Sequence, residues 1–173
     1  TGLENGAAQD VASVTLDDWR VVLGTNLEGV VLGCQMAIRA MRRGGGGSIV
    51  NISSVSGRRP TPGTVAYGAA KAGIESITGT LAVEWAPKVR VNSVVVGMVE
   101  TEQSDLFYGD ADSIAAISKN VPLGRLGRPA DIGWATAFLA SEAASYISGA
   151  SLEVHGGGEP PHYLSTTTAD IKQ

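Results

Sequence analysis

A phenol and an amine lie four residues apart in this chain, as Tyr67 and Lys71. An α-helix has 3.6 residues per turn, so side chains four apart differ by only about 40° and share one face. A neighbouring cation favours phenolate over phenol, and we therefore expect the pKa of Tyr67 to lie below its usual value of about 10. A tyrosine tuned in this way can exchange a proton with a substrate oxygen near neutral pH. The hydroxyl of Ser54 could hydrogen-bond the same oxygen.

The segments around this pair favour a chemical role. A Tyr–Lys pair at helical spacing also occurs on ordinary helix surfaces, where it does no chemistry. Here the apolar run 48–52 predicts a buried strand that ends just before Ser54, and the glycines and prolines that follow predict a loop. From Val65 the composition favours a helix that continues to Trp85.

This order of strand, Ser54, Tyr67, Lys71 and small-residue helix resembles the short-chain dehydrogenase/reductase family, including its 3-oxoacyl reductases. The hallmark of that family is a serine followed by Tyr-x-x-x-Lys, and the resemblance covers nearly the whole chain. It implies an α/β fold with a doubly wound, Rossmann-like parallel sheet. It also implies hydride exchange between NAD or NADP and a carbonyl or secondary alcohol. Tyr67 would be the acid/base, Lys71 would tune its pKa and contact the cofactor ribose, and Ser54 would orient the carbonyl.

A second motif lies inside a long predicted helix from Leu16 to about Arg42, which Thr15 caps. An asparagine within a helix is usually solvated or bonded locally, and Asn26 can be understood in that way. The pattern Asn-Leu-x-Gly at 26–29 also resembles a family motif whose asparagine holds a water that relays protons to the lysine. The resemblance gives Asn26 this relay role.

The cofactor contacts are expected after the next strand. The β-branched run 89–97 predicts a parallel strand covered on both faces, and ligands of such sheets bind beyond the carboxyl ends of strands. The family usually has a proline where this chain has Val96, so the turn loses a fixed φ. The resemblance still implies nicotinamide-end contacts from Gly97, Val99 and Thr101. The alternative is that these residues simply end a strand.

The remaining segments complete the resemblance. Residues 102–121 correspond to the family's variable substrate lid, which would be apolar here, or to a surface helix with no substrate role. An amphipathic helix, 132–141, and a last strand, 146–154, resemble the family's closing elements. We therefore divide the chain into the carboxyl-terminal part of a family domain, 1–158, and a polar tail, 159–173.

Composition excludes several other classes of protein. Thirteen basic and 17 acidic side chains give a net charge of −4, without the basic footprint of a nucleic-acid binder. No apolar run reaches the roughly 20 residues that a membrane helix needs, so no membrane partner is expected. Cys34 is the only cysteine, which indicates a reducing compartment, and we expect a cytoplasmic location. No metal site is expected. The glycines and alanines of helix 65–85 suit packing against a cofactor or against a second subunit, so a homo-oligomer, dimer or tetramer, is expected.

One expected feature is missing from the sequence. A dinucleotide-binding fold carries a glycine-rich phosphate loop after its first strand, and no Gly-x-x-x-Gly-x-Gly follows an apolar strand here. We therefore expect the amino-terminal nucleotide-binding half to be absent, the strand 48–52 to become a sheet edge, and the choice between NAD and NADP to be unreadable. The alternative function, from a different class, is a non-catalytic fragment or assembly subunit that keeps the oligomerisation helices.

Overall fold

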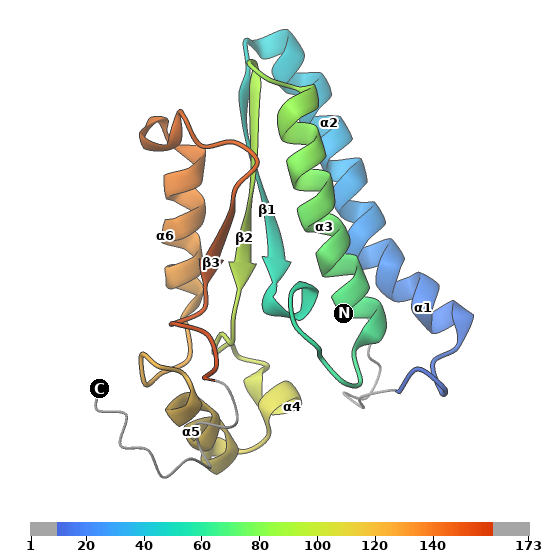
Figure 1. Ribbon diagram of the computed structural model, residues 1–173, viewed down its shortest axis with the longest axis vertical. Helices are drawn as coiled ribbons and strands as arrows, with labels where there is room; N and C mark the ends of the chain where they lie inside the picture. The colour runs from blue at the N-terminus through green and yellow to red at the C-terminus, as the bar shows by residue number, and fades with distance from the viewer. Residues whose placement is uncertain (1–9, 161–173) are drawn as a thin grey trace.

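A computed structural model describes residues 10–160 of the chain. Three parallel strands in the order β1-β2-β3 form one sheet, and helices cover both of its faces (Figure 1). The expected parallel α/β, Rossmann-like fold is confirmed. The elements are α1 (Leu16–Leu23), η1 (Gly24–Glu28), α2 (Gly29–Gly44), β1 (Gly47–Ser54), η2 (Val55–Gly57), α3 (Val65–Glu84), β2 (Val89–Val96), α4 (Ser104–Tyr108), α5 (Ala111–Asn120), α6 (Pro129–Ala140), η3 (Glu142–Ala144) and β3 (Ser151–Val154).

The first helical segment is continuous from Leu16 to Gly44 but contains one π-helical turn, η1, which the sequence did not predict. The Thr15 hydroxyl caps its start by accepting a hydrogen bond from the Asp18 N–H at 3.1 Å, as expected. At its other end, Gly45 adopts a left-handed conformation with φ 96°, which favours glycine.

By length and composition alone, this helix of 29 residues could cross a membrane, so the statement that no apolar run is long enough was wrong. The finding is weak evidence for a span because a helix in a protein core passes the same test. Here Cys34 and Ile38 are buried against the sheet, in a core cluster with Ile49 of β1 and with Val89 and Val91 of β2. One side of the helix therefore packs against the sheet.

Strand β2 is the centre of the described sheet, and five consecutive residues from 91 to 95 are buried. Strand β1 pairs with β2 from Gly47↔Val89 to Ser54↔Val96, and within residues 10–160 its other edge has no partner strand. The expected edge position of the strand 48–52 is therefore confirmed for the part of the chain that the structure describes.

On the side of β2 that faces β3, side chains as well as backbone pairing hold the neighbouring segment in place. The Asn92 amide donates to the Ile147 carbonyl at 2.8 Å and accepts from the Ala150 N–H at 3.0 Å. These bonds hold residues 147–150 as an ordered loop, so the last strand begins at Ser151 and not at 146 as predicted. Nearby, the Arg90 guanidinium donates to the Leu139 and Ser141 carbonyls at 2.9 and 3.0 Å, at the carboxyl end of α6. A cation in this place also complements the helix dipole.

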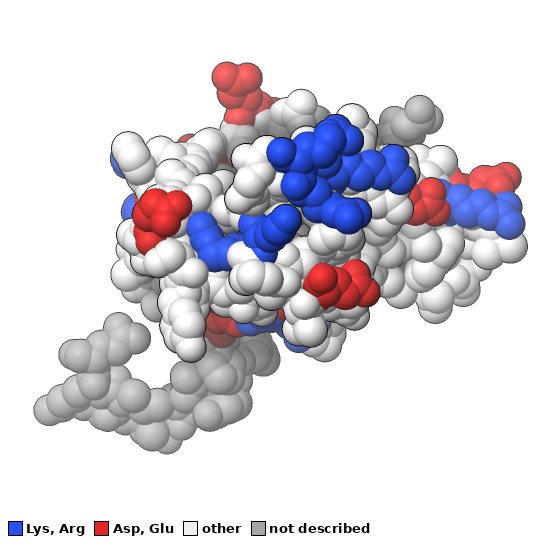
Figure 2. All heavy atoms as spheres, turned by 90° about the horizontal axis from the view of Figure 1, so that it is seen from above, with Lys and Arg blue, Asp and Glu red and all other residues white. Residues whose placement is uncertain are grey.

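A group of basic side chains lies at the end of the sheet where the strands begin (Figure 2). Figure 2 looks down on the end where β1 and β2 begin, and shows Lys and Arg side chains gathered there. Arg42 and Arg43 belong to the last turn of α2 at this end, and the Arg42 guanidinium lies 5.3 Å from the centre of the Trp85 ring. The carboxyl ends of the strands, where ligands of such sheets bind, lie at the opposite end of the molecule.

Candidate active site

Ser54 is the last residue of β1 and begins the turn that leads to α3. Its hydroxyl accepts a hydrogen bond from the Ser56 N–H at 3.2 Å, which closes the turn η2. Gly57 in this turn lies directly on α3, because a Cβ there would be 2.7 Å from the Ala72 nitrogen and 2.8 Å from the Lys71 carbonyl carbon. The turn and the helix therefore touch backbone to backbone, which sets the distance between Ser54 and the side chains of α3.

Tyr67 and Lys71 occupy successive turns of α3, and both side chains are half-buried. The Lys71 ammonium donates to the Ile52 carbonyl of β1 at 3.1 Å and lies 5.3 Å from the centre of the Tyr67 ring. The end of β1 thus anchors the lysine beside the tyrosine. The structure brings Ser54, Tyr67 and Lys71 together, as the sequence predicted.

The predicted effect on the tyrosine was wrong in sign. Burial raises the pKa of Tyr67 above its usual value, and this outweighs the lowering by the hydrogen-bonding Ser54 side chain. Burial also lowers the pKa of Lys71. Desolvation is therefore the largest effect on this half-buried phenol, and the Lys71 ammonium beside it donates to the Ile52 carbonyl. In this structure Tyr67 is a protonated phenol at neutral pH.

Asn26 lies in the π-helical turn η1, which packs against α3. Its amide donates to the Val22 carbonyl at 3.1 Å, the local bond expected of an asparagine within a helix. Leu27 beside it lies so close to α3 that a Cβ on Gly73 would be 3.0 Å from its methyl group. Among residues 10–160 no hydrogen bond joins Asn26 to Lys71, and the water-relay role stays a prediction. Single π turns within α-helices are frequent at functional sites.

The three predicted cofactor contacts all follow β2, at the carboxyl end of the sheet. Gly97 donates its N–H to Val154 at 3.1 Å, and a Cβ there would lie 2.5 Å from the His155 Cβ. A side chain at position 97 would therefore collide with His155, which follows β3. Val99 forms a parallel bridge with Gly127, and the Thr101 N–H donates to the Ser104 hydroxyl at 2.7 Å.

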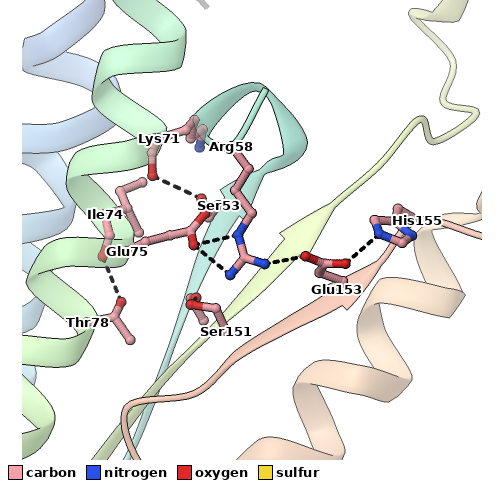
Figure 3. A network of polar contacts seen from close by, with 10 residues as sticks. Ser53, Arg58, Lys71, Ile74, Glu75, Thr78, Ser151, Glu153 and His155 are labelled. Carbon is pink, nitrogen blue, oxygen red and sulfur yellow. Dashed lines mark hydrogen bonds and ion pairs between the residues drawn. The ribbon is translucent and has the colours of Figure 1, made fainter. Parts of the chain in front are cut away.

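Two features of the site escaped the sequence analysis. The first is Tyr108, which the sequence assigned only to an apolar lid and which is half-buried at the end of α4. A negative charge on Tyr108 would raise the pKa of Tyr67. A hydrogen bond with the Val99 backbone lowers the pKa of Tyr108 itself, although burial raises it more. The second feature is an ion-pair network around Arg58, in the loop between Ser54 and Tyr67 (Figure 3). The signal for it was a basic residue in that loop and an acid four residues beyond Lys71, at Glu75.

No group of three or more His, Cys, Asp or Glu side chains in the described residues is placed to hold a metal ion.

Comparison with known proteins identifies the family. The sequence model described as enoyl-(acyl carrier protein) reductase matches residues 2–159. The 3beta-hydroxysteroid dehydrogenase 1 of Eggerthella lenta is 38% identical over 159 residues, which are 88% of this chain and 61% of that protein. A 3-oxoacyl-acyl-carrier-protein reductase of Chlamydia muridarum is 42% identical over 143 residues, 82% of this chain and 56% of that protein.

Solved structures agree with this result. A short-chain dehydrogenase/reductase, glucose/ribitol dehydrogenase, of Brucella melitensis superposes with a TM-score of 0.79 at 34% identity, over 87% of this chain and 60% of that one. A protein described as a 2-deoxy-d-gluconate 3-dehydrogenase of Agrobacterium tumefaciens, solved with bound NADP, gives a TM-score of 0.80 at 35% identity, over 87% and 62%. This chain belongs to the short-chain dehydrogenase/reductase family. It spans between 56 and 61% of the length of the curated relatives described above.

Proposed function

We propose that this chain carries the catalytic part of an oxidoreductase that exchanges a hydride between NAD or NADP and a carbonyl or secondary alcohol. The observation that supports this most directly is the convergence of Ser54, Tyr67 and Lys71 at the carboxyl end of β1. Two curated relatives are consistent with such a reaction, because their names describe a hydroxysteroid dehydrogenase and a 3-oxoacyl reductase.

The residues divide the work between them. Ser54 would hydrogen-bond the substrate oxygen and hold it against the Tyr67 hydroxyl. Because burial raises the pKa of Tyr67, this phenol holds its proton at neutral pH and can donate it to the oxygen of a carbonyl that is being reduced. In the opposite direction, a Tyr67 phenolate would accept the proton from the alcohol. The bound nicotinamide would supply or accept the hydride.

The residues present suit the nicotinamide end of such a cofactor. An ammonium has three N–H donors, and Lys71 gives one to Ile52, so the remaining donors can bind the hydroxyls of a ribose beside Tyr67. The segment that follows β2 contains Gly97, Val99 and Thr101, and a nicotinamide would be held there. Within residues 10–160 no strand–turn–helix carries a glycine-rich phosphate loop, so the pyrophosphate and adenosine contacts would come from elsewhere.

Replacement of Tyr67 by phenylalanine tests the proposal in the full-length protein. The change removes the transferable proton and keeps the ring, so turnover with a carbonyl substrate should fall by about 10²- to 10⁴-fold. Binding of the reduced cofactor, followed by its fluorescence, should be retained, and thermal unfolding should be little changed. Near-normal turnover in the Phe variant would remove Tyr67 from its role.

A non-catalytic assembly subunit is the second candidate, and a groove that suits subunit packing is compatible with it. Helices α2 and α3 enclose an exposed groove of about 530 Å³ lined by residues such as Val31, Ile77, Leu81 and Trp85. Such a groove suits a homo-oligomer, dimer or tetramer, whether or not the chain is catalytic. Cofactor binding separates the two functions, because only the oxidoreductase requires the full-length protein to bind a nicotinamide cofactor.

A further inference from the structure

A network of charged side chains joins three elements next to the candidate active site (Figure 3). The Arg58 guanidinium binds Glu75 of α3 through Nε and a terminal nitrogen, each at 2.8 Å from the same carboxylate oxygen. Another of its nitrogens binds Glu153 of β3, whose second oxygen lies 2.7 Å from Nε2 of His155. Arg58 thus connects the segment after β1 with both the helix and the last strand.

This network is connected to the turn that begins at Ser54 and to the helix that carries Tyr67 and Lys71. The Ser53 hydroxyl, adjacent to Ser54, lies 3.0 Å from the Lys71 carbonyl and 3.2 Å from the Glu75 carboxylate. Arg58 itself is the residue that ends the turn η2, and its N–H donates to the Val55 carbonyl at 2.9 Å. The turn that begins at Ser54 is therefore tied to α3 at its start by Ser53 and at its end by Arg58.

The two partners of Arg58 are not equivalent. The Glu75 side chain is 17% exposed, whereas that of Glu153 is 44% exposed. Exposed ion pairs are weakened by solvent and contribute little. The Arg58–Glu75 pair is more shielded, has two contacts and lies on the helix that carries Tyr67 and Lys71. It is the connection that can fix geometry.

We propose that Arg58 is a positioning residue, which holds the Ser54 hydroxyl against Tyr67 and Lys71 by binding Glu75. Arg58 itself does not touch the substrate. Without the guanidinium, the turn η2 still contacts α3 through Gly57 but loses the ion pair between Arg58 and Glu75. Ser54, at the start of this turn, then becomes more mobile. This inference rests on the proposed function, because it assigns a role through Ser54.

A double-mutant cycle in the full-length protein tests this role. Arg58→Met keeps most of the aliphatic stem and removes the charge and the fork of donors. Since a displacement of about 1 Å can cost 10²-fold in rate, we expect kcat to fall by roughly 10- to 100-fold with the KM for cofactor unchanged. In a Ser54→Ala background the same change should have almost no further effect on kcat, because the residue that Arg58 positions is gone.

Two matched variants complete the design. Arg59→Met removes the neighbouring arginine, whose ion pair is with Glu159 and not with α3, and should keep kcat within about twofold of wild type. Arg58→Lys keeps a cation that lacks the planar fork and should give an intermediate loss of kcat. It also serves as the test if Arg58→Met fails to fold.

The outcomes separate the two proposals. Should Ser54→Ala leave kcat unchanged, the proposed function fails. If Ser54→Ala lowers kcat while Arg58→Met and Arg58→Lys do not, only the positioning role is overturned. An Arg58→Met loss that is the same with and without Ser54 would also overturn it, because the residue would then act independently of Ser54.

Discussion

Addition of one methyl group at Gly57 should move Ser54 away from α3. A Cβ at this position would lie 2.7 Å from the Ala72 nitrogen and 2.8 Å from the Lys71 carbonyl carbon, and both are backbone atoms that cannot rotate away. Optimal contacts between carbon atoms are about 3.5 Å or more, so the turn has to retreat from α3 by roughly 0.7 Å. Gly57 does not adopt a positive φ, so the added Cβ acts through this contact and not through backbone strain.

The effect can be measured on rate and on stability. A shift approaching 1 Å can cost 10²-fold in rate, and we expect Gly57→Ala to lower kcat by about 10- to 100-fold in the full-length protein. Overpacking typically costs about 1–3 kcal/mol in the free energy of unfolding. For a domain of this family's size, each kcal/mol corresponds to roughly 2–4 °C in Tm. Steady-state kinetics with saturating cofactor and a thermal melt measure both.

The chain offers a matched control within the same packing unit. Gly79 lies in α3, and a Cβ there would meet nothing within 4 Å. Gly79→Ala should keep kcat and raise stability by about 0.5–1 kcal/mol, because alanine is the better helix former. If Gly57→Ala retained kcat within twofold and an unchanged Tm, close packing of the turn on α3 would not be what positions Ser54.

Three further predictions concern pH, stability and the isolated chain. Ser54→Ala removes the hydrogen bond that lowers the pKa of Tyr67, so the pKa should rise further. The pH profile of alcohol oxidation, which needs the phenolate, should then shift to higher pH, whereas Ser56→Ala should leave it in place. Asn92→Ala leaves two backbone groups of the loop before β3 without their buried partner, and should lower the free energy of unfolding by about 2–4 kcal/mol in a denaturant titration. Residues 1–173 expressed alone should aggregate and bind cofactor weakly, because β1 exposes an unpaired edge in the described sheet; a monodisperse, active product in light scattering and assay would contradict this.

Local sequence was sufficient to predict the main strands and helices and to place the candidate catalytic residues on them. The apolar run 48–52 and the β-branched run 89–97 each predicted a strand, since such residues pack well on a pleated, buried surface. The Gly and Pro residues between 57 and 63 placed the turn, and helical spacing placed Tyr67 and Lys71 on one face of α3.

Boundaries were less predictable where a distant side chain decides them. The last strand begins at Ser151 because Asn92, far away in the chain, occupies the backbone groups of the preceding loop. The π turn around Asn26 has no signal in residue spacing, because the amphipathic pattern of a helix hardly changes when one turn widens.

The sequence by itself determined which groups could do chemistry: a serine at a strand end, a tyrosine and a lysine one helical turn apart, and a family pattern around them. It could not determine how those groups ionise. Burial is a property of the packed molecule, and it raises the pKa of Tyr67 although the sequence places a cation beside it. Only the tertiary structure brought Arg58, Glu75 and Glu153 together from three separate elements, because ion pairs between distant segments depend on the packing of strands and helix and not on spacing along the chain.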